Sequence, residues 1–473
     1  MYHIEEIKNA AAPKELFESM FKNRAEAFFL ESGMDHCGRG RFSCMGAEPF
    51  LVVKSKGRLV EIFERSPVTG HQSPVKRVIG NPFLMLQELL KKYANQDHHD
   101  EIPFLGGAVG YFSYDLCHFL EELPSTAIDD IQIPDIWVGF YDDIVAVDHT
   151  QGRTYKIRLD IRGGCRTTSE NPPLLHSITS ESGSHEVTSN FLKESYIAAV
   201  RKAMEYIRNG DIYQVNLSQR FEAPLTVEPF ELYERLRAIN PAPFAAYLDC
   251  GEAQIISSSP ERFLKVDAKS RVVETRPIKG TRQRGRTGAE DRELIDELAA
   301  SAKDRAEHIM IVDLERNDLG RICEYGSIEL AESMVSEQYA TVHHLVSTIT
   351  GRLRADVDVV DCLMQCFPGG SITGAPKIRS MEIIDELEPT KRSVYTGALG
   401  YIGFNGAMDL NIAIRTFIAR RGKVYFQAGG GIVADSDPEA EYQETLDKAQ
   451  ALFDALGPGF TAKKRQSVKV SER

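Results

Sequence analysis

The pattern of apolar and polar positions is clearest after residue 190. Residues 196–207 place apolar side chains at helical spacing, and Asn209 and Gly210 supply a common end for a helix. Residues 211–221 then alternate apolar and polar, which predicts a strand because successive side chains of a strand point to opposite faces. The polar face of this predicted strand carries Gln214, Asn216 and Ser218.

The same patterns indicate how the chain is organised. The N-terminal third is predicted to be rich in strands, and 132–160 has the pattern of two strands that form a hairpin. Strands and helices occur in mixed order without regular βαβ alternation, which favours an α+β fold with large antiparallel sheets over a doubly wound parallel sheet. Residues 163–190 are rich in Ser, Thr, Gly and Pro, which is the composition of a linker. We therefore expect an N-terminal region, a linker, a main domain and a polar tail, at 1–165, 166–188, 189–458 and 459–473.

Composition narrows the class of protein. The chain has 473 residues and a net charge of −13, which argues against nucleic acid or an anionic membrane as its main partner. No apolar run approaches the roughly 18 residues of a membrane helix. The first residues carry charges where a secretory signal has its apolar stretch. We therefore expect a cytoplasmic protein that binds neither nucleic acid nor membrane.

The eight cysteines show neither the paired spacing of a zinc site nor a dense disulfide framework. Cys362 and Cys366 lie one helical turn apart without a second Cys or His pair nearby, so small buried thiols are the simpler interpretation. No cysteine stands in a Gly-x-Cys-x-Gly elbow, since the segment around Cys44 lacks the first glycine. The chain therefore shows no obvious glutaminase nucleophile of its own.

Two predicted helices carry carboxylates that need a partner. Glu307 shares a helical face with apolar residues, and an unpaired buried carboxylate is costly, so a cation, a donor or a metal must lie near it. An ion pair with Arg305 or Arg316 is the simpler alternative. In the second helix, Asp437 is a fitting N-cap with proline after it. One line of that helix carries Glu441, Glu444 and Lys448, which suits either a hard cation such as Mg²⁺ or an ordinary Glu444–Lys448 surface pair.

Two glycine-rich segments and a basic run complete the candidates. Residues 368–384 place Pro376 at a helix start whose free N–H groups suit a carboxylate or phosphate, and 426–437 allows close approach of the backbone. A tight turn is the alternative for both, and neither matches a phosphate loop or dinucleotide motif. The basic run 274–286 has the pattern of a solvated loop or an anion patch. Within it, Lys279 has small or apolar neighbours, so desolvation and adjacent cations can make it a nucleophile.

Eight segments occur in the order GDIYQVNLSQRF, SPERF, RPIKGTR, AEHIMIVDLERNDLGR, PGGSITGAPK, YTGALGY, IRT and EYQETLDKA. This series closely resembles the chorismate-utilising enzymes, which include anthranilate synthase component I, aminodeoxychorismate synthase component I, and isochorismate and salicylate synthases. The resemblance is strong over about 190–455 and weak before it, where FFLESG (28–33) and RFSCMGAEP (41–49) carry it. It implies an anthranilate synthase component I-like α/β sandwich with two large facing antiparallel sheets and outer helices. Residues 189–458 would then be the chorismate-binding catalytic domain, and the N-terminal region would add strands.

The resemblance also implies roles for individual residues. Glu307 and Glu444 would be Mg²⁺ ligands, Glu441 would contact metal-bound water, and the metal would hold the ring carboxylate of chorismate. Glu261 would be the general acid that assists loss of the ring hydroxyl. His344 would be the active-site histidine, although a second histidine is adjacent. The expected substrate-binding residues, of which the last five would hold the enolpyruvyl carboxylate, are Gln214, Asn216, Ser371, Tyr395, Arg415, Gly430, Gly431 and Lys448.

Two positions separate the branches of this family. Isochorismate and salicylate synthases carry a lysine that activates water where this chain has Gln214, so ammonia is the expected nucleophile. Anthranilate synthases typically read PIAGT where this chain reads PIKGT, and its Lys279 resembles aminodeoxychorismate synthase component I. The implied reaction has Lys279 attack ring carbon 2 with loss of the 4-hydroxyl. Ammonia then attacks carbon 4 and gives 4-amino-4-deoxychorismate for 4-aminobenzoate and folate biosynthesis.

The partner and one alternative follow from the same resemblance. Because no glutaminase site is visible, ammonia is expected from a glutamine amidotransferase subunit in a heterodimer. Anthranilate synthase component I, which makes anthranilate and pyruvate for tryptophan biosynthesis, is the alternative. FFLESG resembles its regulatory motif, and whether tryptophan binds there stays open. A catalytically dead chorismate-binding regulator would have lost a metal carboxylate, but all three are present.

Overall fold

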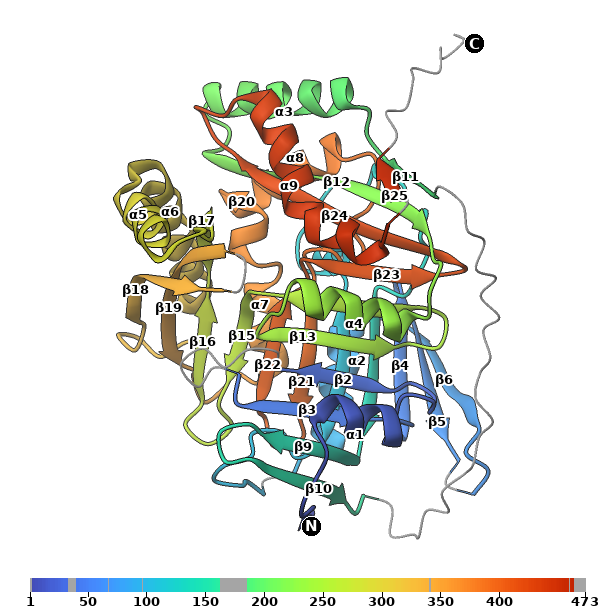
Figure 1. Ribbon diagram of the computed structural model, residues 1–473. Coiled ribbons are helices and arrows are strands. Elements are labelled where there is room, and N and C mark those ends of the chain that lie inside the picture. The colour runs from blue at the N-terminus through green and yellow to red at the C-terminus, as the bar shows by residue number, and fades with distance from the viewer. Residues whose placement is uncertain are drawn as a thin grey trace.

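Two large sheets with helices outside them make up the computed structural model (Figure 1). It describes residues 2–32, 40–66, 68–95, 97–161, 185–339, 342–458 and 460–462. None of the helices in these ranges is long and apolar enough to cross a membrane. The helices are α1 (Pro13–Met20), α2 (Pro82–Lys92), α3 (Lys193–Arg208), α4 (Pro229–Ile239), α5 (Gly288–Ala300), α6 (Ala302–Gly320), α7 (Val359–Cys366), α8 (Lys377–Leu387) and α9 (Pro438–Leu456), with 3₁₀ turns η1 (Tyr114–Phe119) and η2 (Gly370–Ile372).

The first sheet has 13 strands in the described ranges, antiparallel except for the pair β11 and β25. In spatial order they are β1 (Tyr2–Glu6), β10 (Arg153–Leu159), β9 (Asp143–Asp148), β3 (Phe42–Gly46), β2 (Phe28–Glu31), β13 (Phe244–Asp249), β14 (Gln254–Ser259), β23 (Thr416–Arg420), β24 (Lys423–Ile432), β12 (Gln214–Pro224), β11 (His185–Ser189) and β25 (Phe460–Ala462), with β20 (Gly374–Ala375) also on β12.

The second sheet has 12 strands in the same ranges, and its neighbouring strands are antiparallel. In order of hydrogen-bonded neighbours they are β17 (Ile278–Gln283), β19 (Val342–Arg352), β16 (Val272–Arg276), β15 (Arg262–Val266), β22 (Met408–Ile412), β21 (Ala398–Gly403), β7 (Gly107–Phe112), β8 (Ile136–Tyr141), β4 (Leu51–Lys56), β5 (Leu59–Arg65) and β6 (Gln72–Ile79). Strands β16 and β17 pair with the same edge of β19, and β18 (Glu329–Gln338) pairs with its other edge.

The sheets face each other across an apolar layer because strand side chains alternate between faces. Phe28 in β2 packs in one buried cluster with Val52 and Trp137 of the second sheet. Its neighbour Phe29 points the other way and stacks on Phe17 of α1, with ring centroids 5.1 Å apart. The predicted α+β sandwich with two large facing antiparallel sheets and outer helices is therefore confirmed.

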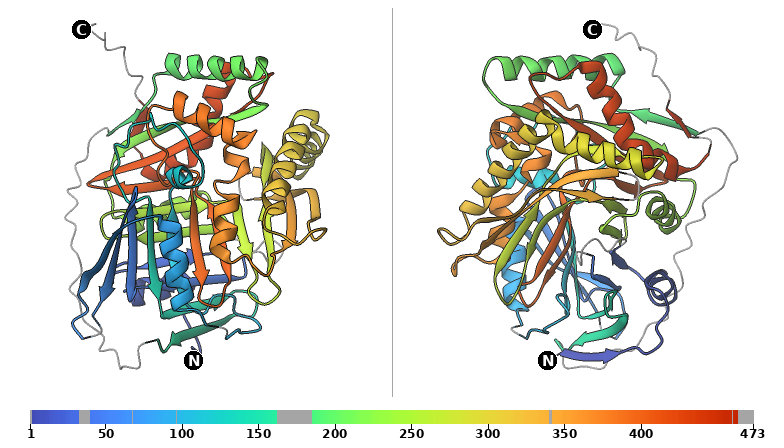
Figure 2. Two further views of the ribbon diagram at one scale, coloured as in Figure 1. Left: turned by 180° about the vertical axis from the view of Figure 1, so that it is seen from behind. Right: turned by 60° about the vertical axis from the view of Figure 1, so that its left-hand side comes forward.

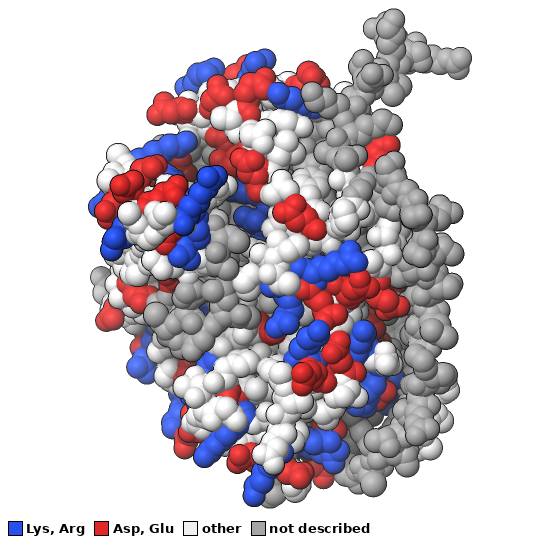
Figure 3. Space-filling view, in the orientation of Figure 1, with Lys and Arg blue, Asp and Glu red and all other residues white. Residues whose placement is uncertain are grey.

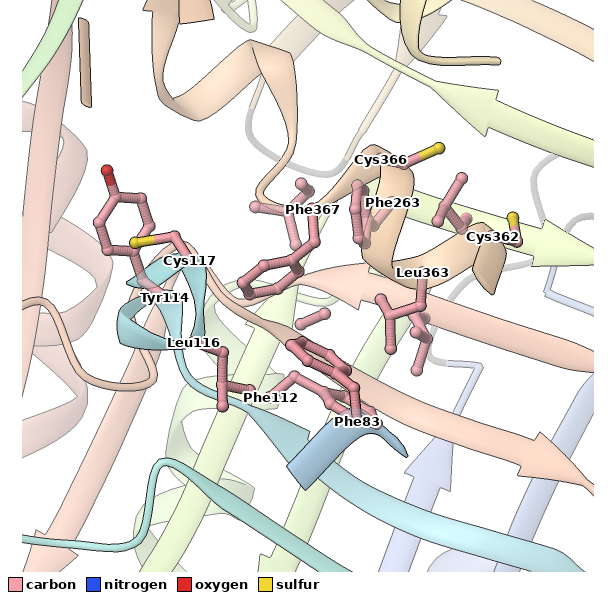
Figure 4. Packing of buried hydrophobic residues seen from close by; sticks show 14 of the residues in the cluster. Phe83, Phe112, Tyr114, Leu116, Cys117, Phe263, Cys362, Leu363, Cys366 and Phe367 are labelled. Atoms are coloured by element: carbon pink, nitrogen blue, oxygen red, sulfur yellow. The ribbon is translucent and has the colours of Figure 1, made fainter. Parts of the chain in front are cut away.

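Helices α2 and α7 cover the outer face of the second sheet (Figure 4). Phe83 of α2 lies 6.3 Å from Phe367, centroid to centroid, and Phe367 lies 6.1 Å from Phe263 of β15. Cys362 and Cys366 are buried in this cluster as free thiols. The prediction of small buried thiols is confirmed for both residues.

Strands from both sides of the predicted linker share each sheet. In the first sheet β2 pairs with β13, and in the second β7 pairs with β21. Residues 185–188 of the predicted linker belong to β11, and 460–462 of the predicted tail form β25. The remaining linker and tail positions lie outside the described residues. The two regions on either side of the linker therefore meet within continuous sheets, as Figure 2 also shows from two further directions.

Local signals located several elements correctly. The helix predicted over 196–207 is α3, which ends at Arg208 with Asn209 as its C-cap, and Gly210 follows with a φ of 82°. At the start of α9, the Asp437 carboxylate accepts a hydrogen bond from the backbone N–H of Ala440 at 2.8 Å. The hairpin expected in 132–160 is formed by β9 and β10, whereas β8 belongs to the second sheet. Periodicity depends on neighbouring residues, whereas the sheet that a strand joins depends on pairing partners elsewhere in the sequence.

The basic run 274–286 is not the solvated loop that its charge pattern suggested. It forms the end of β16 and all of β17, which follow one another along the same edge of β19, while β18 pairs with the other edge. Neighbouring elements supply carboxylates for its arginines, among them Glu337 at 2.6 Å from Arg276 and Asp291 at 2.8 Å from Arg284. The run was therefore not a solvated loop, and a partner such as Glu337, 61 residues from Arg276 along the chain, could not be read from the local charge pattern.

Candidate active site

A cavity of about 150 Å³ lies where β12 and β24 of the first sheet approach β17 and β19 of the second, next to α9. Strands, loops and a helix that are far apart between residues 216 and 448 therefore line one cavity. Eight of the residues predicted from the sequence line it, namely Asn216, Glu261, Lys279, His344, Ser371, Tyr395, Arg415 and Lys448.

Positive charge gathers in this cavity. The Arg415 side chain has no ion pair or hydrogen bond with any described residue, and its backbone has a φ of 52°, which is rare outside glycine. Burial lowers the pKa of Arg415, although Tyr395 opposes this. Lys279 and Lys448 add two more cations to the lining. The outer surface, by contrast, mixes both signs of charge on the face that Figure 3 shows. A guanidinium that is partly buried without a counter-ion favours an anionic partner, so the cavity suits an anionic ligand.

Lys279 reaches the cavity from an irregular part of β17. The pairing of β17 with β19 shifts between Lys279 and Thr281, where Gly280 has a φ of 78°. Such bulges re-aim a side chain. The Lys279 amine donates to the carbonyl of Ser371 at 3.0 Å. Burial lowers the pKa of Lys279, and the Lys448 ammonium lowers it further. Both effects favour the neutral amine, which is the nucleophilic form.

Two further lining groups have shifted pKa values. Burial raises the pKa of Glu261, partly offset by the Ser371 hydroxyl and by Lys279, and this direction favours the protonated form that a general acid needs. Burial and the Arg415 charge lower the pKa of His344 to about 3, so its ring is neutral at pH 7. The His344 Nδ1 lies 2.9 Å from the Thr281 hydroxyl, which orients the ring.

Some lining residues escaped the sequence reasoning. Thr281 and Gln427 both line the cavity. The Oε1 of Gln427 and the Oδ1 of Asn216 are buried and have no hydrogen-bond partner within the described ranges, so both are free to accept from a ligand. Thr281 is the last residue of the PIKGT motif, and Gln427 directly precedes AGGG. Spacing alone does not tell which residues in or beside a motif face the cavity.

Three predicted substrate-binding residues lie outside the cavity lining: Gln214, Gly430 and Gly431. The Gln214 side chain covers Gly431, since a Cβ there would stand 2.1 Å from the Gln214 Nε2. Gly429 lines the cavity, and its carbonyl accepts from the Lys448 ammonium at 3.2 Å. Gly430 faces α9, where a Cβ would stand 3.0 Å from Glu441 Oε2.

The three predicted metal carboxylates come from α6 and α9. Glu444 pairs with Lys448 at 2.6 Å, as the simpler interpretation expected. Glu307 lies 3.9 Å from Lys303, so neither Arg305 nor Arg316 is its partner. Burial raises the pKa of Glu307 and of Glu441, and the charge of Glu444 adds to both effects. Burial opposes the charge on Glu444, but Lys448 outweighs it and lowers its pKa.

As the side chains stand, no three His, Cys, Asp or Glu groups in the described ranges are close enough together to hold a metal ion. The chemistry of the three carboxylates nevertheless fits Mg²⁺, which prefers oxygen ligands. Glu441 Oε2 is buried and has no hydrogen-bond partner within those ranges. Glu444 also lies near enough to Glu307 and Glu441 for like charges to repel. A divalent cation would supply the missing partner and remove that repulsion.

Glu315 of α6 is a buried carboxyl group that the sequence reasoning did not single out. Its Oε2 accepts a hydrogen bond from the Thr275 hydroxyl at 2.8 Å. Burial and the nearby Glu261 raise the pKa of Glu315 to about 8, so the folded protein holds this proton at pH 7. In the unfolded chain a glutamate loses its proton near pH 4.3.

This difference predicts a pH-dependent loss of stability. Between the two pKa values the folded state binds one more proton than the unfolded state, so Glu315 lowers stability by up to about 1.4 kcal/mol per pH unit as the pH rises. We expect Glu315→Gln to flatten the decline of the unfolding free energy between pH 5 and 8, measured by urea unfolding. The exposed Glu293→Gln is the control. Parallel declines in wild type and Glu315→Gln would contradict the assignment.

The chain is similar to proteins of one family, and its relatives in that family carry different names. The model of the chorismate binding enzyme family matches residues 53–454. Aminodeoxychorismate synthase component 1 of Bacillus subtilis (strain 168) is 40% identical over 93% of both chains. Anthranilate synthase component 1 of Acetivibrio thermocellus is 41% identical over 93% of this chain and 92% of its own. The crystal structure of anthranilate synthase component I from Streptococcus pneumoniae TIGR4 has a TM-score of 0.75 and 31% identity, over 96% of this chain and 99% of that one.

Proposed function

The chain belongs to the family of chorismate-binding enzymes, and from this premise we propose that it aminates chorismate at ring carbon 4 to give 4-amino-4-deoxychorismate. The ammonia comes from a glutamine amidotransferase subunit, and the product serves 4-aminobenzoate and folate biosynthesis. The observation that carries the proposal is Lys279, a partly buried amine in the cavity wall whose pKa is lowered, together with the buried carboxyl group of Glu261 in the same lining.

The charge of the cavity supports chorismate as the substrate. Chorismate has two carboxylates, and the unpaired Arg415 guanidinium, Lys448 and Tyr395 are grouped to bind the enolpyruvyl carboxylate. Mg²⁺ held by Glu307 and Glu444, with Glu441 on a bound water, would neutralise the ring carboxylate. The unpartnered Asn216 Oδ1 can accept a hydrogen bond from the ring hydroxyl.

The proposed chemistry has two displacements. The neutral Lys279 amine attacks ring carbon 2, the two conjugated ring double bonds shift, and the 4-hydroxyl leaves carbon 4 as water with the proton of Glu261. The proton that the amine loses on attack restores Glu261. Ammonia then attacks carbon 4, both double bonds shift back, and the bond to Lys279 breaks as a proton passes from the ammonia to the departing lysine. Dividing one displacement into two steps is the usual benefit of covalent catalysis.

A second cavity offers a route for ammonia. It has a volume of about 410 Å³ and shares Pro260, His344 and Arg415 with the lining of the first. Its wall is polar and carries both signs of charge, from Asp447 and Asp454 of α9 and from Arg284 and Arg415. We assign this second cavity as the passage through which ammonia from the amidotransferase subunit reaches carbon 4.

Anthranilate synthase component 1 is the second candidate function, because relatives of both names are similar to this chain. The two activities differ in a readily measured way. Amination at carbon 4 keeps the enolpyruvyl group, whereas anthranilate formation releases pyruvate. Lys279 would have no covalent role in the second reaction.

The product therefore tests the proposal. Purified chain is incubated with chorismate, Mg²⁺ and an ammonium salt, and products are read by mass spectrometry and fluorescence. We expect an aminated product that keeps its enolpyruvyl group and becomes 4-aminobenzoate when a lyase is added. A reaction without ammonium is the control. Fluorescent 2-aminobenzoate with released pyruvate would establish the second candidate instead.

A further inference from the structure

A buried ion pair lies behind the active-site cavity and outside its lining. The side chains of Arg392 and Glu388 are 1% and 2% exposed. The Arg392 Nε donates to Glu388 Oε2 at 2.9 Å, and Nη2 donates to Oε1 at 2.7 Å. The Glu388 Oε1 also accepts from the backbone N–H and the hydroxyl of Ser218, at 2.9 and 2.7 Å. Burial of such a pair is costly unless further bonds satisfy its polar atoms.

Two of the three remaining hydrogen bonds of Arg392 reach the walls of the cavity, and the third goes from Nη1 to the Thr396 hydroxyl at 3.3 Å. The Arg392 Nη1 donates to the carbonyl of Ile372 at 3.0 Å, and Nη2 donates to the carbonyl of Asn216 at 2.7 Å. The guanidinium also lies 5.7 Å from the centre of the Tyr395 ring. Ile372, Asn216 and Tyr395 all line the cavity, and they come from η2, β12 and the turn before β21. One side chain therefore joins three separate walls.

We propose that Arg392 is a positioning residue that sets the relative placement of these walls. Through Ile372 it also holds Ser371, whose carbonyl accepts from the Lys279 amine. Loss of the arginine geometry therefore displaces the nucleophile as well as the substrate. A lysine keeps the charge but lacks the planar fork that binds a carboxylate and two carbonyls together. This inference deepens the proposed function, because the walls are those of the proposed chorismate site.

The test compares two Arg→Lys variants. Arg65 in β5 also binds a carboxylate, that of Glu26, and two backbone carbonyls, those of Pro49 at 3.2 Å and Gly70 at 2.6 Å. It lines none of the cavities described above. We expect similar losses of melting temperature in Arg392→Lys and Arg65→Lys. Only Arg392→Lys should lower kcat for chorismate consumption, by about tenfold or more, since small misplacements can cost 10²-fold. The KM for ammonium should stay near the wild-type value.

A folded Arg392→Lys with wild-type kcat would overturn the inference, as would an equal loss of kcat in Arg65→Lys. If Arg392→Lys does not fold, Glu388→Gln takes its place with the same expectation, because it removes the charge that orients the guanidinium. The assay follows the loss of chorismate, so it tests the role of Arg392 whether the product is 4-amino-4-deoxychorismate or anthranilate. If the wild type consumes no chorismate, the proposed function fails. Chorismate affinity then decides the role of Arg392, with weaker binding expected only in Arg392→Lys.

Discussion

Lys279→Ala is expected to slow amination of chorismate at carbon 4 by roughly 10³-fold or more, the scale seen when a nucleophile is removed. Lys279 is the amine in the cavity wall that the proposed mechanism uses to attack ring carbon 2, and alanine leaves nothing to form that bond. Magnesium and chorismate binding should remain largely intact, because the Arg415 guanidinium and the carboxylates of α6 and α9 are untouched. Steady-state kinetics and calorimetry measure the two effects separately.

Lys279→Arg tests whether Lys279 acts as a nucleophile or only supplies a positive charge. Arginine keeps a cation in the cavity but stays protonated, so it cannot attack carbon 2. We expect Lys279→Arg to be nearly as inactive as Lys279→Ala. Intact-protein mass spectrometry of wild type incubated with chorismate and Mg²⁺, without ammonia, should show a mass gain of one chorismate less one water. Wild-type rates in Lys279→Ala would end the covalent scheme.

Loss of a metal carboxylate is expected to have the second-largest effect. Glu444→Gln should weaken Mg²⁺ binding by roughly 100-fold or more, given that even residues behind metal ligands cost 10–100-fold. Turnover at low Mg²⁺ should fall with it, and a chelator should abolish turnover of the wild type. Calorimetric titration with Mg²⁺ in the absence of chorismate measures the affinity directly, so the result does not depend on which product forms.

The same helix offers a control for this variant. Glu439 lies at the start of α9 with its side chain 60% exposed and pairs with Lys193 at 2.7 Å. Glu439→Gln should therefore leave Mg²⁺ affinity and turnover near the wild-type values. Unchanged Mg²⁺ affinity in Glu444→Gln would show that the carboxylates of α6 and α9 do not form a metal site.

Much of the fold followed from local pattern. Helical spacing with an Asn-Gly end located α3, and Asp437 with the proline after it located the start of α9. These signals depend on residues within a few positions of one another, so they are readable in the chain. The allocation of β8 and β9 to different sheets was not readable, because it depends on partners elsewhere in the sequence.

The candidate site shows the same division. Motif order identified eight of the lining residues, including Lys279 and Arg415. It did not show that Lys303 rather than an arginine lies near Glu307, nor that Gln214 covers Gly431. Both facts depend on side-chain direction, which motif spacing does not specify.

The sequence by itself determined the family, the main helices and the chemical groups of the cavity, because these depend on short periodic patterns and on motifs in a fixed order. Only the tertiary structure decided which groups meet. Lys279 and the Ser371 carbonyl lie 92 residues apart in the chain, and Arg392 and the Asn216 carbonyl lie 176 apart. Contacts across such separations form only when the two sheets pack, since the burial that brings these groups together is a property of the whole fold.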